Sequence, residues 1–246
     1  MIKNWLKNKR KETASFENLT LPAVHLRTGG KQFRDNKYFV QSAQQEVARL
    51  KDNFSLSKHS VLLDLGCGFG RLAIGFLSTG DPVSYIGIDV NNNAISWCER
   101  YISSRNSTFQ FVHLNLQNNR YNPSGEPIDL KFKLPLEDKS VDVIYLYSVF
   151  SHMLQNDIKY YLRELHRVLV SSGKVFFTAF TEPDVATETV NPPGYQNIEW
   201  KDALHCVRYN HDFFLGLIED SGFAVKKFEY GQETEGQSAF YLSKIE

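Results

Sequence analysis

Hydrophobic residues in this chain gather in short runs that alternate with amphipathic stretches. From Lys58 onward the runs are rich in Val, Ile, Leu, Tyr and Phe, which is typical of buried strands. The predicted strands are Val61–Leu65, Tyr85–Val90, Phe109–Leu114, Val141–Tyr147 and Lys174–Phe180. Between them apolar residues recur at helical spacing, as at Ile95, Cys98 and Ile102. The pattern predicts an α/β fold with a Rossmann-like, doubly wound, mostly parallel sheet covered by helices.

The residues before this core predict a helical segment. Val40, Ala43, Val47 and Leu50 form one apolar face, and the preceding stretch 21–31 contains Pro22 and a Gly-Gly pair that favour a loop. We expect residues 1–57 to cap the mouth of the sheet over a core of residues 58–180.

The residues after the core predict an insertion and a closing unit. Residues 181–210 contain three prolines and a glycine with little periodicity, which indicates a long loop or a short helical insertion. A helix from Asn210 to Gly222 then leads into strands over 223–230 and 238–243, joined by the tight linker 231–236 as an antiparallel hairpin. The expected whole is one domain, 1–246, around a seven-stranded sheet.

A glycine-rich turn follows the first core strand, in the sequence Asp64-Leu65-Gly66-Cys67-Gly68-Phe69-Gly70-Arg71. Glycines let the backbone approach a ligand closely. The NAD fingerprint G-x-G-x-x-G needs glycine where this chain has Arg71, and the carboxylate of Asp64 would repel a pyrophosphate while favouring a cation.

Asp89 ends the second strand, where a carboxylate can accept hydrogen bonds from both hydroxyls of a ribose. The alternative is a capping role for the helix that begins near Asn91–Asn93. The glycine turn on the neighbouring strand favours the ribose interpretation.

These motifs resemble those of class I S-adenosylmethionine-dependent methyltransferases. Residues 64–70 are similar to motif I of that class and residues 87–90 to motif II, while 134–144 and 165–169 with Gly173 resemble the approaches to the fourth and fifth strands. A narrower similarity, to bacterial small-molecule and glycan methyltransferases, rests on residues 26–30, 121–125 and 148–153. This chain departs from many relatives in having Asn115, not an acidic residue, after the third strand.

The resemblance implies S-adenosyl-L-methionine as cofactor, S-adenosyl-L-homocysteine as product, and a role for each motif residue. Gly66, Gly68 and Gly70 would line the methionine and ribose portion, Asp64 its amino end, and Asp89 the ribose. The remaining implied cofactor residues are Cys67, Arg71 and Val90 in the same turns, Asn115 and Leu116 beside adenine, Tyr147 and Ser148 beside the sulfonium, and Arg27 and Gly29 at the carboxylate.

Methyl transfer from a sulfonium needs alignment of the acceptor, and a hydroxyl acceptor also needs a base. His152 follows the fourth strand at the ligand-binding edge and is our candidate base; the alternative is a histidine that only caps or packs. His205, Tyr209 and His211 are candidate acceptor contacts or structural residues. No carboxylate pair or histidine cluster has metal-ligand spacing near this strand, so we expect no metal.

The composition of the chain limits the chemical class of the methyl acceptor. Lys plus Arg equals Asp plus Glu at 28 each, so no net charge attracts nucleic acid, although Met1–Lys11 is basic. Three scattered cysteines and no apolar run of membrane-spanning length predict a soluble, cytoplasmic protein. We expect O-methylation of a small molecule such as a sugar or glycan intermediate. The alternatives are N-methylation of a small amine or RNA, and a catalytically silent cofactor-binding module.

Overall fold

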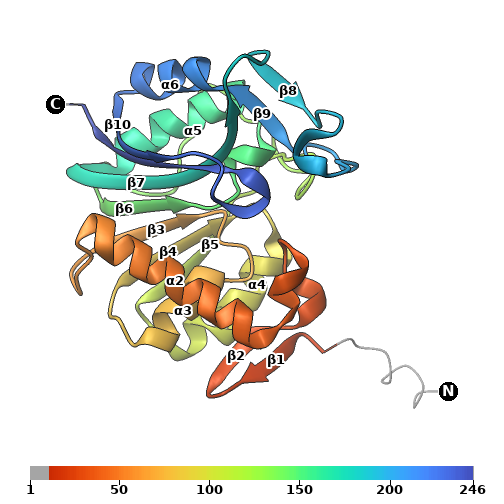
Figure 1. Cartoon of the computed structure of the whole chain (residues 1–246). Coiled ribbons are helices and arrows are strands. Elements are labelled where there is room, and N and C mark those ends of the chain that lie inside the picture. Colours follow the sequence, from red (N-terminus) through yellow and green to blue (C-terminus); the bar gives the residue numbers. More distant parts are fainter. Residues whose placement is uncertain (1–10, 246) are drawn as a thin grey trace.

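A nine-stranded, mostly parallel sheet forms the centre of the computed structural model, which describes residues 11–245 (Figure 1). A separate two-stranded sheet precedes it. The strands are β1 (Thr13–Phe16), β2 (Leu19–Pro22), β3 (Val61–Leu65), β4 (Ser84–Asp89), β5 (Phe109–His113), β6 (Val141–Leu146), β7 (Leu169–Glu182), β8 (Glu188–Val190), β9 (Val207–Asn210), β10 (Phe223–Glu229) and β11 (Ser238–Lys244). The α-helices are α2 (Asn36–Phe54), α3 (Arg71–Thr79), α4 (Asn92–Tyr101), α5 (Gln155–Val168) and α6 (His211–Asp220).

The strand order places a ligand crevice at the middle of the sheet. Along the order β10-β11-β7-β6-β3-β4-β5, the chain proceeds outward from β3 through β4 to β5, and then returns to begin β6 on the other side of β3. All of these neighbours from β7 to β5 pair in parallel, while β11 pairs antiparallel with β7 and with β10. In such sheets ligands bind beyond the carboxyl ends of the strands where the order reverses, which here lies between β3 and β6.

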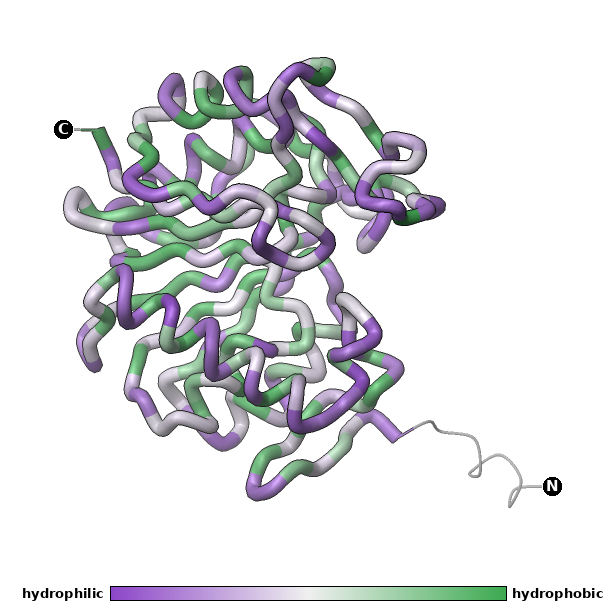
Figure 2. Tube along the Cα trace, in the orientation of Figure 1, coloured by the Kyte–Doolittle hydropathy of each residue, from purple (hydrophilic) through white to green (hydrophobic). Residues whose placement is uncertain are grey.

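Two layers of helices cover the sheet. Helices α2, α3 and α4 lie on one side and α5 and α6 on the other (Figure 1), and hydrophobic residues follow the central strands between them (Figure 2). The packing of α2 on α3 is close, because a Cβ at Gly75 would lie 2.6 Å from the carbonyl oxygen of Ala43. The apolar stripe that predicted α2 therefore faces α3, with Val47 also at this contact.

The seven predicted strands and the mostly parallel, Rossmann-like arrangement are confirmed, and the structure adds strands that the sequence did not predict. Residues 181–210, expected as a loop or helical insertion, contain β8 and β9. Strand β9 pairs in parallel with the end of β7, where Phe180 lies opposite Arg208. The prolines that predicted a loop fall between these strands. The β1–β2 hairpin was likewise not predicted, and most of the basic segment Met1–Lys11 lies outside the described residues.

None of the helices within residues 11–245 is long and apolar enough to cross a membrane.

Candidate active site

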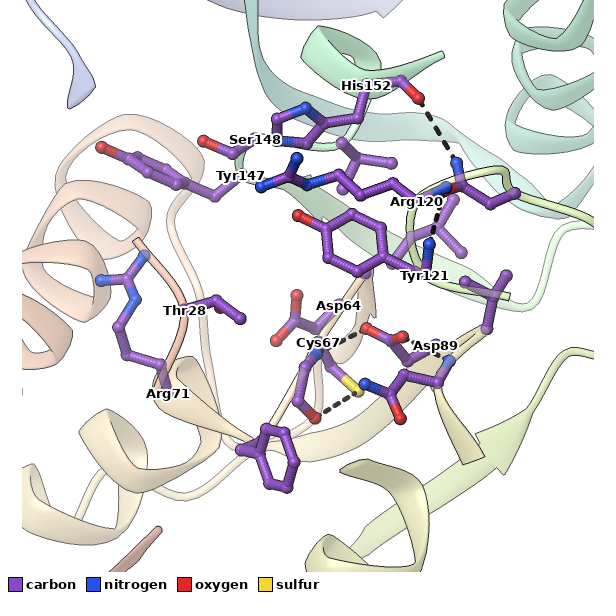
Figure 3. Close-up of a pocket in the computed structure, with 18 of the residues that line it drawn as sticks. Thr28, Asp64, Cys67, Arg71, Asp89, Arg120, Tyr121, Tyr147, Ser148 and His152 are labelled. Carbon is purple, nitrogen blue, oxygen red and sulfur yellow. Dashed lines mark hydrogen bonds between the residues drawn. The ribbon is translucent and has the colours of Figure 1, made fainter. Parts of the chain in front are cut away.

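A cavity of about 460 Å³ opens at the carboxyl ends of β3, β4 and β6 (Figure 3). Its walls come from segments far apart in the sequence: the turns after these strands, the N-terminal residues 22–39, the loop after β5, residue 205 and the hairpin linker at 234–235. This is the position that the strand order predicts for a ligand.

The glycine turn after β3 is anchored on β4. The amides of Gly66 and Cys67 both donate to the carbonyl oxygen of Ile88, at 2.7 and 3.1 Å. Gly68 lines the cavity with a φ of +51°, and a Cβ placed there would meet no protein atom within 4 Å. Gly70 does not line the cavity; its φ of +74° and its contact with Ile102 shape the start of α3. The open side of Gly68 is the space that a ligand would fill.

Substitution Gly68→Ala should therefore weaken cofactor binding without blocking folding. The added methyl group costs about 1–2 kcal/mol in backbone strain and occupies ligand space. Gly80→Ala is the matched control, because Gly80 has a φ of +71°, meets nothing within 4 Å and lies outside the cavity at the end of α3. The thermal unfolding temperature should fall by a similar amount in both variants. Calorimetry with S-adenosylhomocysteine should show a loss of binding affinity in Gly68→Ala only. Equal affinities would contradict the assignment.

Asp89 connects the turn after β3 with the turn after β4. Its Oδ2 accepts a hydrogen bond from the Gly68 amide and its Oδ1 one from the Asn91 amide, each at 2.7 Å. Each carboxylate oxygen has a second acceptor site, so both can still accept from a ligand hydroxyl. The cap of α4 is the side chain of Asn91, which accepts from the amides of Asn93 and Ala94. Asn91, and not Asp89, therefore caps α4.

Asp64 and Arg71 place a carboxyl group and a guanidinium at the end of β3. Asp64 is 3% exposed and accepts a hydrogen bond from the Tyr85 hydroxyl. Burial raises the pKa of Asp64 to about 7, against the lowering effects of Tyr85 and Arg71. The Arg71 guanidinium lies 4.9 Å from the centre of the Tyr147 ring and donates to the Tyr145 hydroxyl. One carboxyl group and one guanidinium therefore face the same cavity.

Arg27 lies at the cavity wall, but its guanidinium is occupied by protein partners. It donates to the carbonyl oxygens of Pro22 and Phe33 at 2.9 and 3.1 Å, and to Asn36 Oδ1 at 2.6 Å. These bonds hold the N-terminal segment in place, with Gly29 beside it in the lining. Arg71 is therefore better placed than Arg27 to meet a ligand carboxylate.

His152 faces the cavity from the 3₁₀ helix Phe150–His152 and is 9% exposed. Its Nδ1 lies 3.0 Å from the carbonyl oxygen of Leu204. A carbonyl only accepts, so Nδ1 carries the proton of the neutral ring and Nε2 keeps its lone pair. Burial lowers the pKa of His152 to about 4, with Arg120 contributing in the same direction. The ring is therefore neutral near pH 7.

Some of the other predicted residues line the cavity and some do not. Cys67, Val90, Leu116, Tyr147, Ser148 and His205 line the cavity, whereas Asn115, Tyr209 and His211 do not. Asn115 accepts from the Asn122 side chain. Tyr209 is buried and donates to the Met153 carbonyl oxygen, and the His211 ring packs 4.7 Å from that of Phe228. Tyr209 and His211 therefore pack against other residues and are not candidate acceptor contacts.

Sequence reasoning missed several lining residues, notably Thr28, Arg120, Tyr121, Thr234 and Glu235. Arg120 and Tyr121 follow β5 in a loop that has no periodicity. Their position beyond the carboxyl end of a strand points to them, and Tyr121 also lies in the stretch 121–125 that resembles small-molecule methyltransferases. Among residues 11–245 no group of three His, Cys, Asp or Glu side chains could hold a metal ion.

The core of the chain matches a known family. Residues 63–177 match the family model described as a methyltransferase domain. Over 143 residues the chain is 27% identical to a fatty-acid O-methyltransferase of Mycolicibacterium smegmatis, a stretch that covers 58% of this chain and 41% of that protein. The chain thus spans about two fifths of the length of this curated relative.

Solved structures share the fold. The [4+2]-cyclase SpnF superposes with a TM-score of 0.61 at 15% identity, covering 83% of this chain and 82% of that chain. A SAM-dependent methyltransferase from Aquifex aeolicus gives a TM-score of 0.52 at 18% identity, covering 81% and 88%. At these identities the similarity establishes the fold alone.

Proposed function

We propose that this chain, a class I S-adenosylmethionine-dependent methyltransferase by its fold and family match, methylates an oxygen of a small-molecule acceptor. One observation carries the proposal: a single cavity joins the glycine turn and Asp89 at one end to His152 at the other. The cofactor residues and a neutral histidine with a free nitrogen thus border the same space (Figure 3).

The cavity residues fit the chemistry of the cofactor. Asp89 suits the ribose hydroxyls because its two oxygens keep acceptor sites, and the open side of Gly68 leaves room beside it. Asp64 and Arg71 suit the ammonium and carboxylate of the methionine portion. Leu116 and Val90 offer flanking surface for adenine. When bound, S-adenosylmethionine supplies a methyl group activated by a cationic sulfur.

The remaining residues of this chain have to position the acceptor and remove its proton. Alignment of two reactants in a site contributes roughly 7–11 kcal/mol in favourable cases. His152 Nε2 accepts the hydroxyl proton, and the Leu204 carbonyl stabilises the charged ring that results. No side chain of the enzyme needs to form a covalent bond with the methyl group.

Oxygen as the methylated atom is supported by the relative from M. smegmatis, whose name specifies O-methylation of fatty acids. The balanced net charge supports a small molecule, such as a sugar, glycan intermediate or hydroxy acid, over RNA. The second candidate is a function without methyl transfer, and it is favoured by one observation: the similar fold of SpnF belongs to a [4+2]-cyclase.

An acceptor panel with methyl-labelled S-adenosylmethionine separates these candidates. The panel contains sugars, hydroxy acids, fatty acids and amines, and the product is S-adenosylhomocysteine together with labelled acceptor. Label in an oxygen-bound methyl group supports the proposal, and label found only in amines contradicts it. If calorimetry shows cofactor binding but no panel member is labelled, the function without methyl transfer is favoured.

A further inference from the structure

Arg120 is a positively charged residue beside His152 in the cavity, and the proposed chemistry does not use it. It lines the cavity beside His152 and Tyr121 (Figure 3), and its side chain is 20% exposed. Its Nη1 donates to Asp202 Oδ2 at 3.1 Å. Within residues 11–245 its buried Nε has no hydrogen-bond partner. Its Nη2 also makes no hydrogen bond to these residues and is not buried, so it can donate to a ligand in the cavity.

His205 adds a second unsatisfied group at the same wall. Its buried Nδ1 has no hydrogen-bond partner among the residues that the structure describes, since the nearest carboxylate oxygen, on Asp202, is 3.8 Å away. The His205 ring packs at a right angle to Trp200, with ring centres 5.1 Å apart, and is held there. Arg120 and His205 therefore lie at the same wall of the cavity, and the described residues leave a nitrogen of each side chain without a hydrogen-bond partner.

The charges around Arg120 leave its positive charge uncompensated toward the cavity. Asp202 is 67% exposed and Glu235 is also exposed, so water and salt screen both carboxylates. His152 is neutral near pH 7. A guanidinium is always charged and offers parallel N–H groups that match a carboxylate.

From these contacts we propose that Arg120, assisted by His205, binds a carboxylate group of the methyl acceptor. This inference rests on the proposed function, and it narrows the acceptor to a hydroxy acid whose hydroxyl reaches His152 while its carboxylate is held at Arg120. The Asp202 bond fixes the guanidinium through Nη1 and leaves Nη2, which makes no hydrogen bond to the described residues, for the ligand.

Nuclear magnetic resonance of the arginine Nε–H groups tests the anion site without requiring turnover. The protein is saturated with S-adenosylhomocysteine and titrated at constant ionic strength with acetate or with acetamide, its uncharged match. Arg120→Lys identifies the Arg120 resonance. Arg208 provides the internal control, because its Nε is also buried and unpaired within the described residues but Arg208 does not line the cavity.

Acetate should move the Arg120 resonance saturably, and acetamide should not. In turnover assays, Arg120→Met should lower kcat/KM for hydroxy acids about 10- to 100-fold, mainly through KM, while Arg208→Met leaves it unchanged and cofactor affinity stays constant. An Arg120 resonance that responds to acetate no more than that of Arg208 overturns the anion site. Acetate binding without any labelled acceptor would instead refute the proposed function and leave this site standing.

Discussion

Asp89→Asn should weaken binding of S-adenosylhomocysteine about 10- to 100-fold, because hydrogen bonds to a charged group are worth about 1.5–3 kcal/mol each. The substitution removes the charge and turns one acceptor atom into a donor. That donor would face either the Gly68 amide or the Asn91 amide, which both need an acceptor. The change therefore disturbs the glycine turn and the ribose contact together. Calorimetry measures the loss.

Asp142→Asn is the control for a lost carboxylate at a strand end. Asp142 Oδ2 accepts from the Val61 amide at 2.8 Å, at the start of β3 and outside the cavity. Asp89→Asn should lose more stability in thermal unfolding than Asp142→Asn, because both oxygens of Asp89 accept backbone amides, whereas an asparagine at position 142 keeps an oxygen for the Val61 amide. If Asp142→Asn lowered cofactor affinity as strongly as Asp89→Asn, the loss would reflect general destabilisation and the ribose assignment would fail.

The sequence predicted the central strands and the glycine turn because these features are local. A buried strand needs a run of apolar residues, and a turn that approaches a ligand needs glycine, so both are visible within about ten residues. The predicted strand over 61–65 coincides with β3. Gly66 and Gly68 both line the cavity, but only Gly68 has open space on the side of a Cβ, since a Cβ at Gly66 would meet the Val149 side chain.

The acceptor wall could not be predicted because distant contacts build it. Glu233 in the hairpin linker pairs with Arg49 of α2 and accepts from the Tyr147 hydroxyl, and these contacts bring Thr234 to the cavity. Nothing near residue 233 in the sequence indicates this partner. Arg27 lines the cavity, but the sequence could not indicate that carbonyl groups of its own segment accept from its guanidinium.

The anion site and the base are linked through the charge of Arg120. Burial is the largest cause of the low pKa of His152, and the positive charge of Arg120 lowers it further. A carboxylate bound at Arg120 would offset that charge and favour the protonated ring. The pKa of His152 should then be higher with acceptor bound than in the free enzyme. An anionic acceptor would thus strengthen the base that acts on its own hydroxyl, since catalytic bases work best with a pKa near the operating pH.

His152→Ala should slow methyl transfer to a hydroxyl about 10²- to 10⁴-fold and leave the affinity for S-adenosylhomocysteine unchanged. The neutral ring is the active form, and a pKa of about 4 keeps it neutral at all higher pH values. For the wild-type chain, kcat/KM for the acceptor, measured with S-adenosylmethionine saturating so that the titration of Asp64 in the free enzyme does not enter, should be flat between about pH 5.5 and 8. A histidine with an ordinary pKa near 6.5 would give a decline below about pH 6.5.

His59→Ala is the control for this substitution, because His59 is exposed in the turn before β3 and does not line the cavity. It should retain wild-type transfer rates. Transfer that survives in His152→Ala at the wild-type rate would remove His152 as the base. Carboxylates need no base near pH 7, since they are already ionised. A fatty-acid carboxylate methylated equally by both variants, with hydroxyl methylation lost only in His152→Ala, would confine the role of His152 to proton removal.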